Sequence, residues 1–127
     1  MNFEKVIFGF FITLAATLNF GFFIGDMTRP ELHNVYGLGA ALVVSLIATV
    51  LKFGDRTQLG AVHLATSLVA DLQLIAAAVI WTWASYGTPG GMDGNHMSQV
   101  ISMSAGALMA NGVSVVLMVG ETLSLRR

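Results

Sequence analysis

Four long apolar stretches alternate with short polar connections along the chain. A helix crosses the hydrocarbon core of a bilayer with about 20 residues, so each stretch predicts a transmembrane helix. The polar connections between them are too short to hold a soluble domain. We therefore expect an all-α polytopic membrane protein in which the whole chain forms one transmembrane domain. The expected helices cover residues 6–24, 35–51, 59–84 and 100–120 of residues 1–127.

Composition supports the membrane assignment and excludes several classes of protein. Hydrophobic residues make up 55% of the chain and charged residues only 10%, whereas soluble domains carry about 25% charged residues. The chain contains no cysteine, which excludes disulfide frameworks and thiolate metal sites. Its net charge is −1, so it offers no basic surface for nucleic acid.

The basic residues predict how the helices are oriented. If consecutive helices alternate in direction, five basic residues fall on one side of the membrane and only Arg29 falls on the other. Basic residues concentrate on the cytoplasmic side of membrane proteins, so we expect cytoplasmic N- and C-termini. Short connections favour antiparallel neighbours, which predicts an up-down-up-down bundle. The five basic residues are Lys5, Lys52, Arg56, Arg126 and Arg127.

Small residues recur at intervals of four positions in three of the expected helices. Positions four apart lie on one helix face, and small side chains let helix backbones approach closely in lipid. We expect these stripes to pack the protein's own bundle; the alternative is that one stripe faces outward and binds another subunit. The stripes are Gly9, Thr13, Thr17, Gly21 and Gly25 in the first helix, Gly37, Ala41, Ser45 and Thr49 in the second, and Ser102, Gly106, Ala110 and Ser114 in the fourth.

The phenylalanines of the first helix largely avoid its small-residue stripe. If that stripe packs the bundle, the aromatic side chains must point elsewhere. We therefore expect them to face lipid or a partner protein. They are Phe8, Phe11, Phe22 and Phe23.

One carboxylate lies near the middle of the third apolar stretch. A charged side chain at the bilayer centre costs roughly 2.5–3.5 kcal/mol on insertion scales, so Asp71 needs polar neighbours. At about 1.5 Å of rise per residue, Asn111 lies at a similar depth and is the expected partner of Asp71. The remaining candidates of this polar layer are Thr17 and Asn19 in the first helix, Ser45 in the second, and His63 and Ser67, which precede Asp71 at steps of four.

Two interpretations of Asp71 remain open at the level of sequence. In the structural one, the acid is protonated by desolvation and donates a hydrogen bond within a network that joins the helices. In the functional one, Asp71 binds a cation or relays protons. No second acid lies within an apolar stretch, so a coupled transport cycle would need an acid from a neighbouring subunit.

The histidines indicate no cofactor. Haem ligation normally takes two axial side chains on facing helices, and His63 is the only histidine within an apolar stretch. His33, Asp93 and His96 belong to two connections on the same side and could meet around a metal, but we expect them to be solvated loop residues. Because no nucleophile–base set, phosphate loop or zinc motif is present, we expect no enzyme, no cofactor and no metal site.

Three segments of the sequence resemble a known family. They are TLNFGFFIGD (17–26), LIATVLKFGDRTQ (46–58) and ATSLVADLQLIAAA (65–78). Together they resemble a family of small, uncharacterised bacterial inner-membrane proteins of this size. The resemblance covers about residues 3–82 and leaves out the glycine-rich connection and the fourth helix. It implies location in the bacterial inner membrane and association with potassium channels, and it implies no activity.

These observations predict a non-enzymatic integral membrane protein that acts by helix–helix assembly. Its partners would be the lipid bilayer and either further copies of itself or a larger membrane complex. In that complex it would be an accessory subunit, for example of a cation (potassium) channel or transporter. The alternative is a small homo-oligomeric protein that conducts protons or cations and uses Asp71 as its site.

Overall fold

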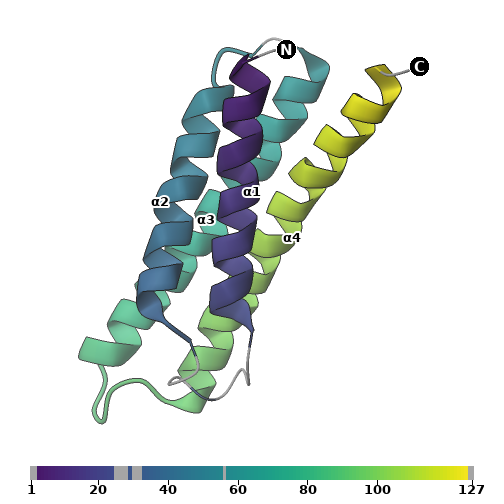
Figure 1. Cartoon of the computed structure of the whole chain (residues 1–127). Coiled ribbons are helices and arrows are strands. Elements are labelled where there is room, and N and C mark those ends of the chain that lie inside the picture. Colours follow the sequence, from purple (N-terminus) through teal and green to yellow (C-terminus); the bar gives the residue numbers. More distant parts are fainter. Residues whose placement is uncertain (1–2, 25–28, 30–32, 56, 126–127) are drawn as a thin grey trace.

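The structure is a computed structural model and describes residues 3–24, 29, 33–55 and 57–125. The described residues form four α-helices and no strand (Figure 1). Each helix is long enough and apolar enough to cross a membrane, which confirms the all-α prediction and the number of candidate spans. The helices are α1 (Phe3–Phe23), α2 (Val35–Lys52), α3 (Gln58–Tyr86) and α4 (Gly94–Leu125).

The last helix is longer than the apolar pattern indicates. It begins at Gly94, ahead of the expected start at residue 100, and ends at Leu125, beyond the expected end at residue 120. Asp93 explains the early start, because its Oδ1 accepts a hydrogen bond of 2.8 Å from the backbone N–H of His96 and so caps the first turn. Helix capping is set by hydrogen bonds, which hydropathy does not report.

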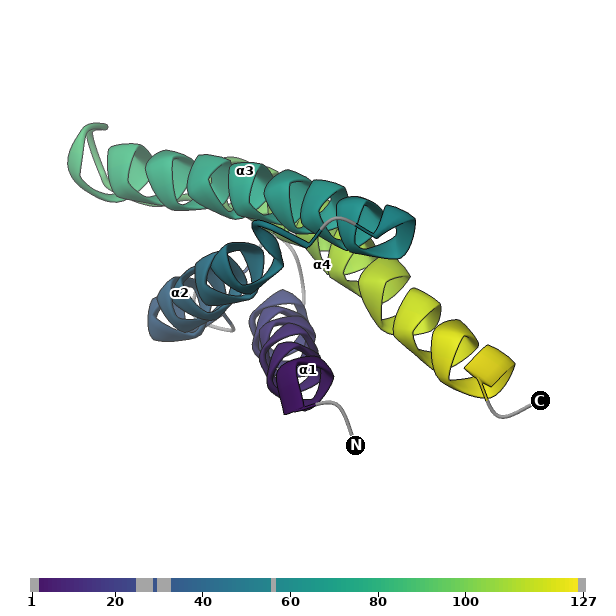
Figure 2. The same cartoon turned by 90° about the horizontal axis from the view of Figure 1, so that it is seen from above.

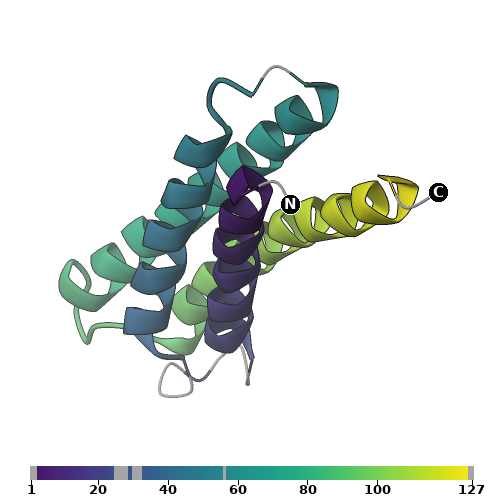
Figure 3. The same ribbon diagram turned by 45° about the horizontal axis from the view of Figure 1, so that its top comes forward.

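Each helix packs against two others. α1 contacts α2 and α4, α2 contacts α3, and the most extensive contact joins α3 and α4. The start of α1 and the end of α4 lie at the same end of the bundle (Figure 1). Seen along the bundle, the C-terminal part of α4 turns away from the other helices (Figures 2 and 3). The bundle is therefore open at the end where the chain starts and finishes.

The small-residue stripes of α2 and α4 largely face the bundle interior, as expected, although Ser102 at the start of the α4 stripe is exposed. Ala41, Ser45 and Thr49 are buried on α2, and Ala110 and Ser114 are buried on α4. A Cβ at Gly106 would collide with the side-chain amide of Gln73 on α3. A side chain at residue 106 would therefore have to displace the end of the Gln73 side chain.

The central part of the α1 stripe faces outward, whereas Gly9 at its start is half-buried beside Met118 of α4. Thr13, Thr17 and Gly21 are exposed, and a Cβ at Gly21 would meet no other atom within 4 Å. The expectation that the phenylalanines of α1 point outward is also wrong, since Phe8 and Phe22 are buried in the core. Gly25, the last member of this stripe, lies outside the described residues.

Asn19 gives the physical reason for this orientation of α1. Both faces of the helix are largely apolar, so hydropathy does not distinguish them. Asn19 lies on the same face as Phe8 and Phe22, and its side-chain amide is hydrogen-bonded to Ser104 on α4. An amide turned toward lipid would lack such a partner, which costs several kcal/mol. The face that carries Asn19 is therefore the inner one.

Candidate functional site

Asp71 forms the link between α2 and α3. Its side chain is buried, with 5% of the residue exposed. Ser45 donates its hydroxyl to Oδ1 of Asp71 over 2.7 Å, and the hydroxyl of Thr49 lies within hydrogen-bonding distance of Oδ2. Ser45 and Thr49 lie one turn apart on α2, so the two carboxyl oxygens meet two consecutive turns of the neighbouring helix.

Asn111 is not the partner of Asp71, contrary to the expectation from depth. It lies on α4 and is fully buried, but neither its amide nitrogen nor its amide oxygen has a hydrogen-bond partner among the described residues. The estimate from helical rise gives a level along the membrane normal and no rotation about the helix axis. Asp71 faces α2, and that rotation separates it from the expected partner.

A second polar group joins α3 to α4 near the open end of the bundle. Nδ1 of His63 lies 3.1 Å from the hydroxyl of Ser114, and the hydroxyls of Thr66 and Ser114 are hydrogen-bonded to each other. Thr66 also donates to the carbonyl of His63 over 3.0 Å. The ring of Phe8 from α1 meets the His63 ring edge to face at 5.0 Å. His63 is thus held by α1, α3 and α4 together.

The other expected members of the polar layer divide into two groups. Asn19 belongs to the interior and contacts Ser104, whereas Thr17 is exposed and donates to the carbonyl of Thr13 over 2.7 Å. The inclusion of Thr17 in the interior layer was therefore wrong. Ser67 is fully buried, and its hydroxyl has no hydrogen-bond partner among the described residues.

Several residues of this network were missed as site residues at the level of sequence. Thr49 and Ser114 appeared only as small stripe residues, and Ser104 and Gln73 were not selected. One signal was available for Thr49, because it lies one turn from Ser45 on the same face. No comparable signal existed for Ser104, whose role depends on how α1 is rotated against α4.

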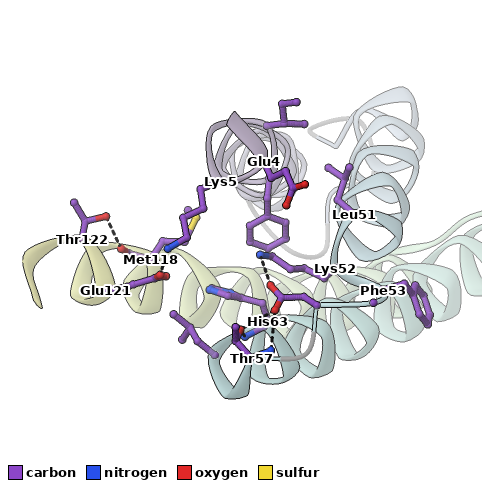
Figure 4. A pocket seen from close by; sticks show the side chains of 16 residues that line it. Glu4, Lys5, Leu51, Lys52, Phe53, Thr57, His63, Met118, Glu121 and Thr122 are labelled. Atoms are coloured by element: carbon purple, nitrogen blue, oxygen red, sulfur yellow. Dashed lines mark hydrogen bonds and ion pairs between the residues drawn. The ribbon is translucent and has the colours of Figure 1, made fainter. Parts of the chain in front are cut away.

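A cavity of about 870 Å³ opens beside this network, between the start of α1, the end of α2, the start of α3 and the end of α4. Figure 4 shows charged side chains from α1, α2 and α4 converging around it, with His63 at its inner side. Lys5 forms an ion pair with Glu121, which joins the start of α1 to the end of α4. Nζ of Lys52 lies 4.3 Å from the centroid of the Phe8 ring and 3.3 Å from Asp55.

Asp55 organises the turn between α2 and α3 at the rim of this cavity. Its Oδ1 accepts hydrogen bonds from the hydroxyl of Thr57 at 2.7 Å and from the backbone N–H of Thr57 at 2.9 Å. These bonds lower the pKa of Asp55 from 3.8 to about 2, with a smaller contribution from Lys52. Thr57 in turn caps α3 by accepting from the N–H of Gly60. The carboxylate is therefore a structural part of the turn.

The candidate ligands in the connections do not come together around a metal. Asp93 pairs with Nδ1 of His96 at 2.7 Å and caps α4, and hydrogen bonding to His96 lowers the pKa of Asp93. His33 is buried, and its Nδ1 lies 2.6 Å from the carbonyl of Phe22. Within the described part of the chain, no group of three histidine or carboxylate side chains is placed to hold a metal ion.

These features define a class of protein: an all-helical chain with four candidate membrane spans and a buried network of hydroxyl, amide, imidazole and carboxyl groups. The chain belongs to DUF6394, a family of unknown function whose model matches residues 32–122. That match includes the glycine-rich connection and most of α4, which the resemblance noted from the sequence left out. No curated protein and no solved structure matches the chain.

Proposed function

We propose that this protein is a non-enzymatic integral membrane protein that acts by assembling with another membrane protein through α1. The observation that carries the proposal is the outward orientation of the small-residue stripe of α1. The stripes of α2 and α4 are used inside the bundle, where they bring helices together. On α1, by contrast, Thr13, Thr17 and Gly21 are exposed and take no part in the interior of the bundle.

The outer face of α1 has the shape that a second helix requires. Thr13, Thr17 and Gly21 form a low strip on it, and Phe10 and Phe20 stand on the same face with 61% and 53% of their surface exposed. Helices associate in lipid where small residues allow close backbone approach and larger side chains pack beside them. The hydroxyl of Thr17 already bonds to its own helix, so this side chain needs no polar partner.

We further propose that the four helices cross the membrane as an up-down-up-down bundle with both termini in the cytoplasm. Lys5 and Lys52, from different helices, line the same cavity, which agrees with one basic side of the protein. The ion pair between Lys5 and Glu121 supports placing the start of α1 and the end of α4 on that side. The inner membrane of a bacterium is the proposed location, on the strength of the family resemblance.

The same resemblance makes a potassium channel the first partner to test. In this proposal the protein is an accessory subunit of such a channel or of another cation transporter. An accessory subunit needs a stable fold and an outer binding face. The extensive α3–α4 contact and the outer strip of α1 support these two properties.

Substitution of Gly21 tests the proposal. Gly21→Leu fills the outer strip of α1 and should leave the monomer folded while the larger assembly is lost on native gels in mild detergent. Gly39→Leu is the matched control, because Gly39 is also an exposed helical glycine with no atom within 4 Å of its Cβ position. If Gly21→Leu and the wild-type protein assemble equally, α1 is not the binding face and the proposal fails.

A second function remains a candidate because of Asp71. A homo-oligomeric protein that conducts protons or cations would need an ionisable group among unpaired polar atoms in its core. Asp71 lies one helical turn from Ser67, whose buried hydroxyl has no partner among the described residues. Wild-type vesicles would then show a flux that Asp71→Asn vesicles with equal protein content lack. Equal flux in the two preparations would exclude this function.

A further inference from the structure

Two buried polar side chains, one on α3 and one on α4, have no hydrogen-bond partner among the described residues. Asn111 on α4 and Ser67 on α3 are fully buried. Both side-chain atoms of Asn111 and the hydroxyl of Ser67 lack a hydrogen-bond partner. Burying such atoms without partners costs about 1–3 kcal/mol each, and native proteins rarely leave them so.

Contacts on either side place Ser67 and Asn111 at the same level of the α3–α4 contact. On one side, His63 of α3 meets Ser114 of α4. On the other side, Gln73 of α3 covers Gly106 of α4. Ser67 and Asn111 lie between these two contacts on their respective helices, so they occupy one level of the interface.

We propose that water binds between Ser67 and Asn111 and that this water connects Asp71 to the cavity at the open end of the bundle. A buried water typically makes about three hydrogen bonds to otherwise unpaired polar groups. The hydroxyl of Ser67 and the two amide atoms of Asn111 supply that number. This inference does not depend on the assembly proposed for α1.

The spacing along α3 fits a path that water must complete. His63, Ser67 and Asp71 are buried residues at steps of four on this helix, which separates consecutive groups by about 6 Å along its axis. That distance is too long for a direct hydrogen bond and matches one bridging water. His63 lines the cavity, so the path begins at a surface that solvent reaches.

The hydrogen bonds around Asp71 show which species would exchange along this path. Thr49 carries one hydroxyl hydrogen, but its Oγ1 lies within bonding distance of Oδ2 of Asp71 and, at 3.0 Å, of the carbonyl of Ser45. A proton on Asp71 allows both contacts to be hydrogen bonds, because Thr49 then donates to the carbonyl and accepts from the acid. A neutral acid also avoids the cost of a buried charge. The path therefore carries the carboxyl proton of Asp71 to and from water.

Hydrogen–deuterium exchange of that proton tests the inference. The protein in lipid is transferred to D₂O, and the infrared band of the protonated carboxyl is followed; its absence from Asp71→Asn assigns it. Exchange should be complete within the mixing time in the wild type. It should slow by about tenfold or more in Asn111→Leu and in Ser67→Ala, because exchange then requires transient opening of the interface.

Ser102→Ala is the control, because Ser102 is an exposed serine of α4 that donates to its own helix at Ser98. It should exchange as fast as the wild type. Equal exchange rates in Ser67→Ala, Ser102→Ala and the wild type would overturn the path, as would a wild type without a carboxylic acid band at Asp71. Ser67→Ala removes a single oxygen atom, so the test does not depend on whether Asn111→Leu folds.

An experimental map at high resolution tests the bound species directly. Density within hydrogen-bonding distance of both Ser67 and Asn111 is expected in the wild type. If soaking with Rb⁺ places an anomalous peak there, the site holds a monovalent cation and the assignment to water is wrong. A map that shows protein atoms alone between the two side chains would also overturn it.

Discussion

Ser45 on α2 donates its hydroxyl to Oδ1 of Asp71 on α3 over 2.7 Å. Together with the contact from Thr49, this bond closes the α2–α3 interface at the level of the only acid within the described apolar core. Hydrogen bonds between membrane helices stabilise by roughly 0.6–2 kcal/mol each. The acid therefore contributes to the fold whether or not it also exchanges protons.

Two substitutions at Asp71 separate its hydrogen-bonding role from its charge. Asp71→Asn keeps one acceptor and gains donors, so it should unfold within about 0.5 kcal/mol of the wild type, the range of a substitution that preserves its contacts. Asp71→Leu leaves the hydroxyl of Ser45 without its partner and should cost about 1–3 kcal/mol. Unfolding by denaturant in detergent micelles measures both. An Asn variant as unstable as the Leu variant would show that the fold requires an ionised carboxylate.

Two glycines of α4, Gly106 and Gly112, differ in the space around them. Gly106→Leu should destabilise the monomer by about 1–3 kcal/mol, the usual cost of overpacking, because its side chain must displace Gln73. Gly112→Leu on the same helix has no atom within 4 Å of its Cβ position and should be tolerated. Thermal unfolding of the two purified variants compares them. A stable Gly106→Leu protein would mean that α3 and α4 do not approach as closely as described here.

The proposed membrane orientation predicts which cysteines an impermeant reagent reaches. Gln58 and Asn95 are exposed polar residues in the first turns of α3 and α4, and the chain contains no cysteine of its own. Asn95→Cys in intact cells should react with a thiol reagent added outside, whereas Gln58→Cys should react only after lysis. The reverse result would place both termini outside and invalidate the positive-inside argument for this chain.

The turn between α2 and α3 predicts a loss of stability in acid. Hydrogen bonds from Thr57 lower the pKa of Asp55 to about 2 in the folded protein, against 3.8 for an unperturbed carboxyl. Because the pKa of Asp55 is lower in the folded state, its ionised form stabilises the fold above pH 3.8. This stabilisation is lost as the pH falls from 3.8 toward 2. The free energy of unfolding should therefore decrease over this interval.

Asp55→Asn isolates the contribution of this carboxyl from those of other acids. The variant cannot ionise at this position, so its stability should change less than that of the wild type between pH 4.5 and pH 2, roughly the titration interval. The difference between the two pH profiles is the quantity to measure. Parallel profiles would show that Asp55 has the same pKa in the folded and unfolded states.

The number and type of the elements could be predicted from the sequence. Apolar stretches near the length of a membrane span leave a helix as the structure that satisfies its own backbone, and each of the four expected stretches became a helix. The helix ends could be predicted less well. Capping hydrogen bonds to Asp93 and Thr57 set the starts of α4 and α3. A hydropathy pattern does not predict such bonds.

The rotation of each helix about its axis could not be predicted from the sequence, and this rotation selects the partners in the site. In a soluble helix the apolar face identifies the interior, but a membrane helix is apolar all round. Asp71 therefore pairs with Ser45 and Thr49 although Asn111 lies at a similar expected depth. For the same reason α1 turns Phe8 inward and leaves Gly21 outside. The rotation of each helix is set by the hydrogen bonds of its buried polar groups and by close packing against particular neighbours. Both depend on residues far apart in the chain.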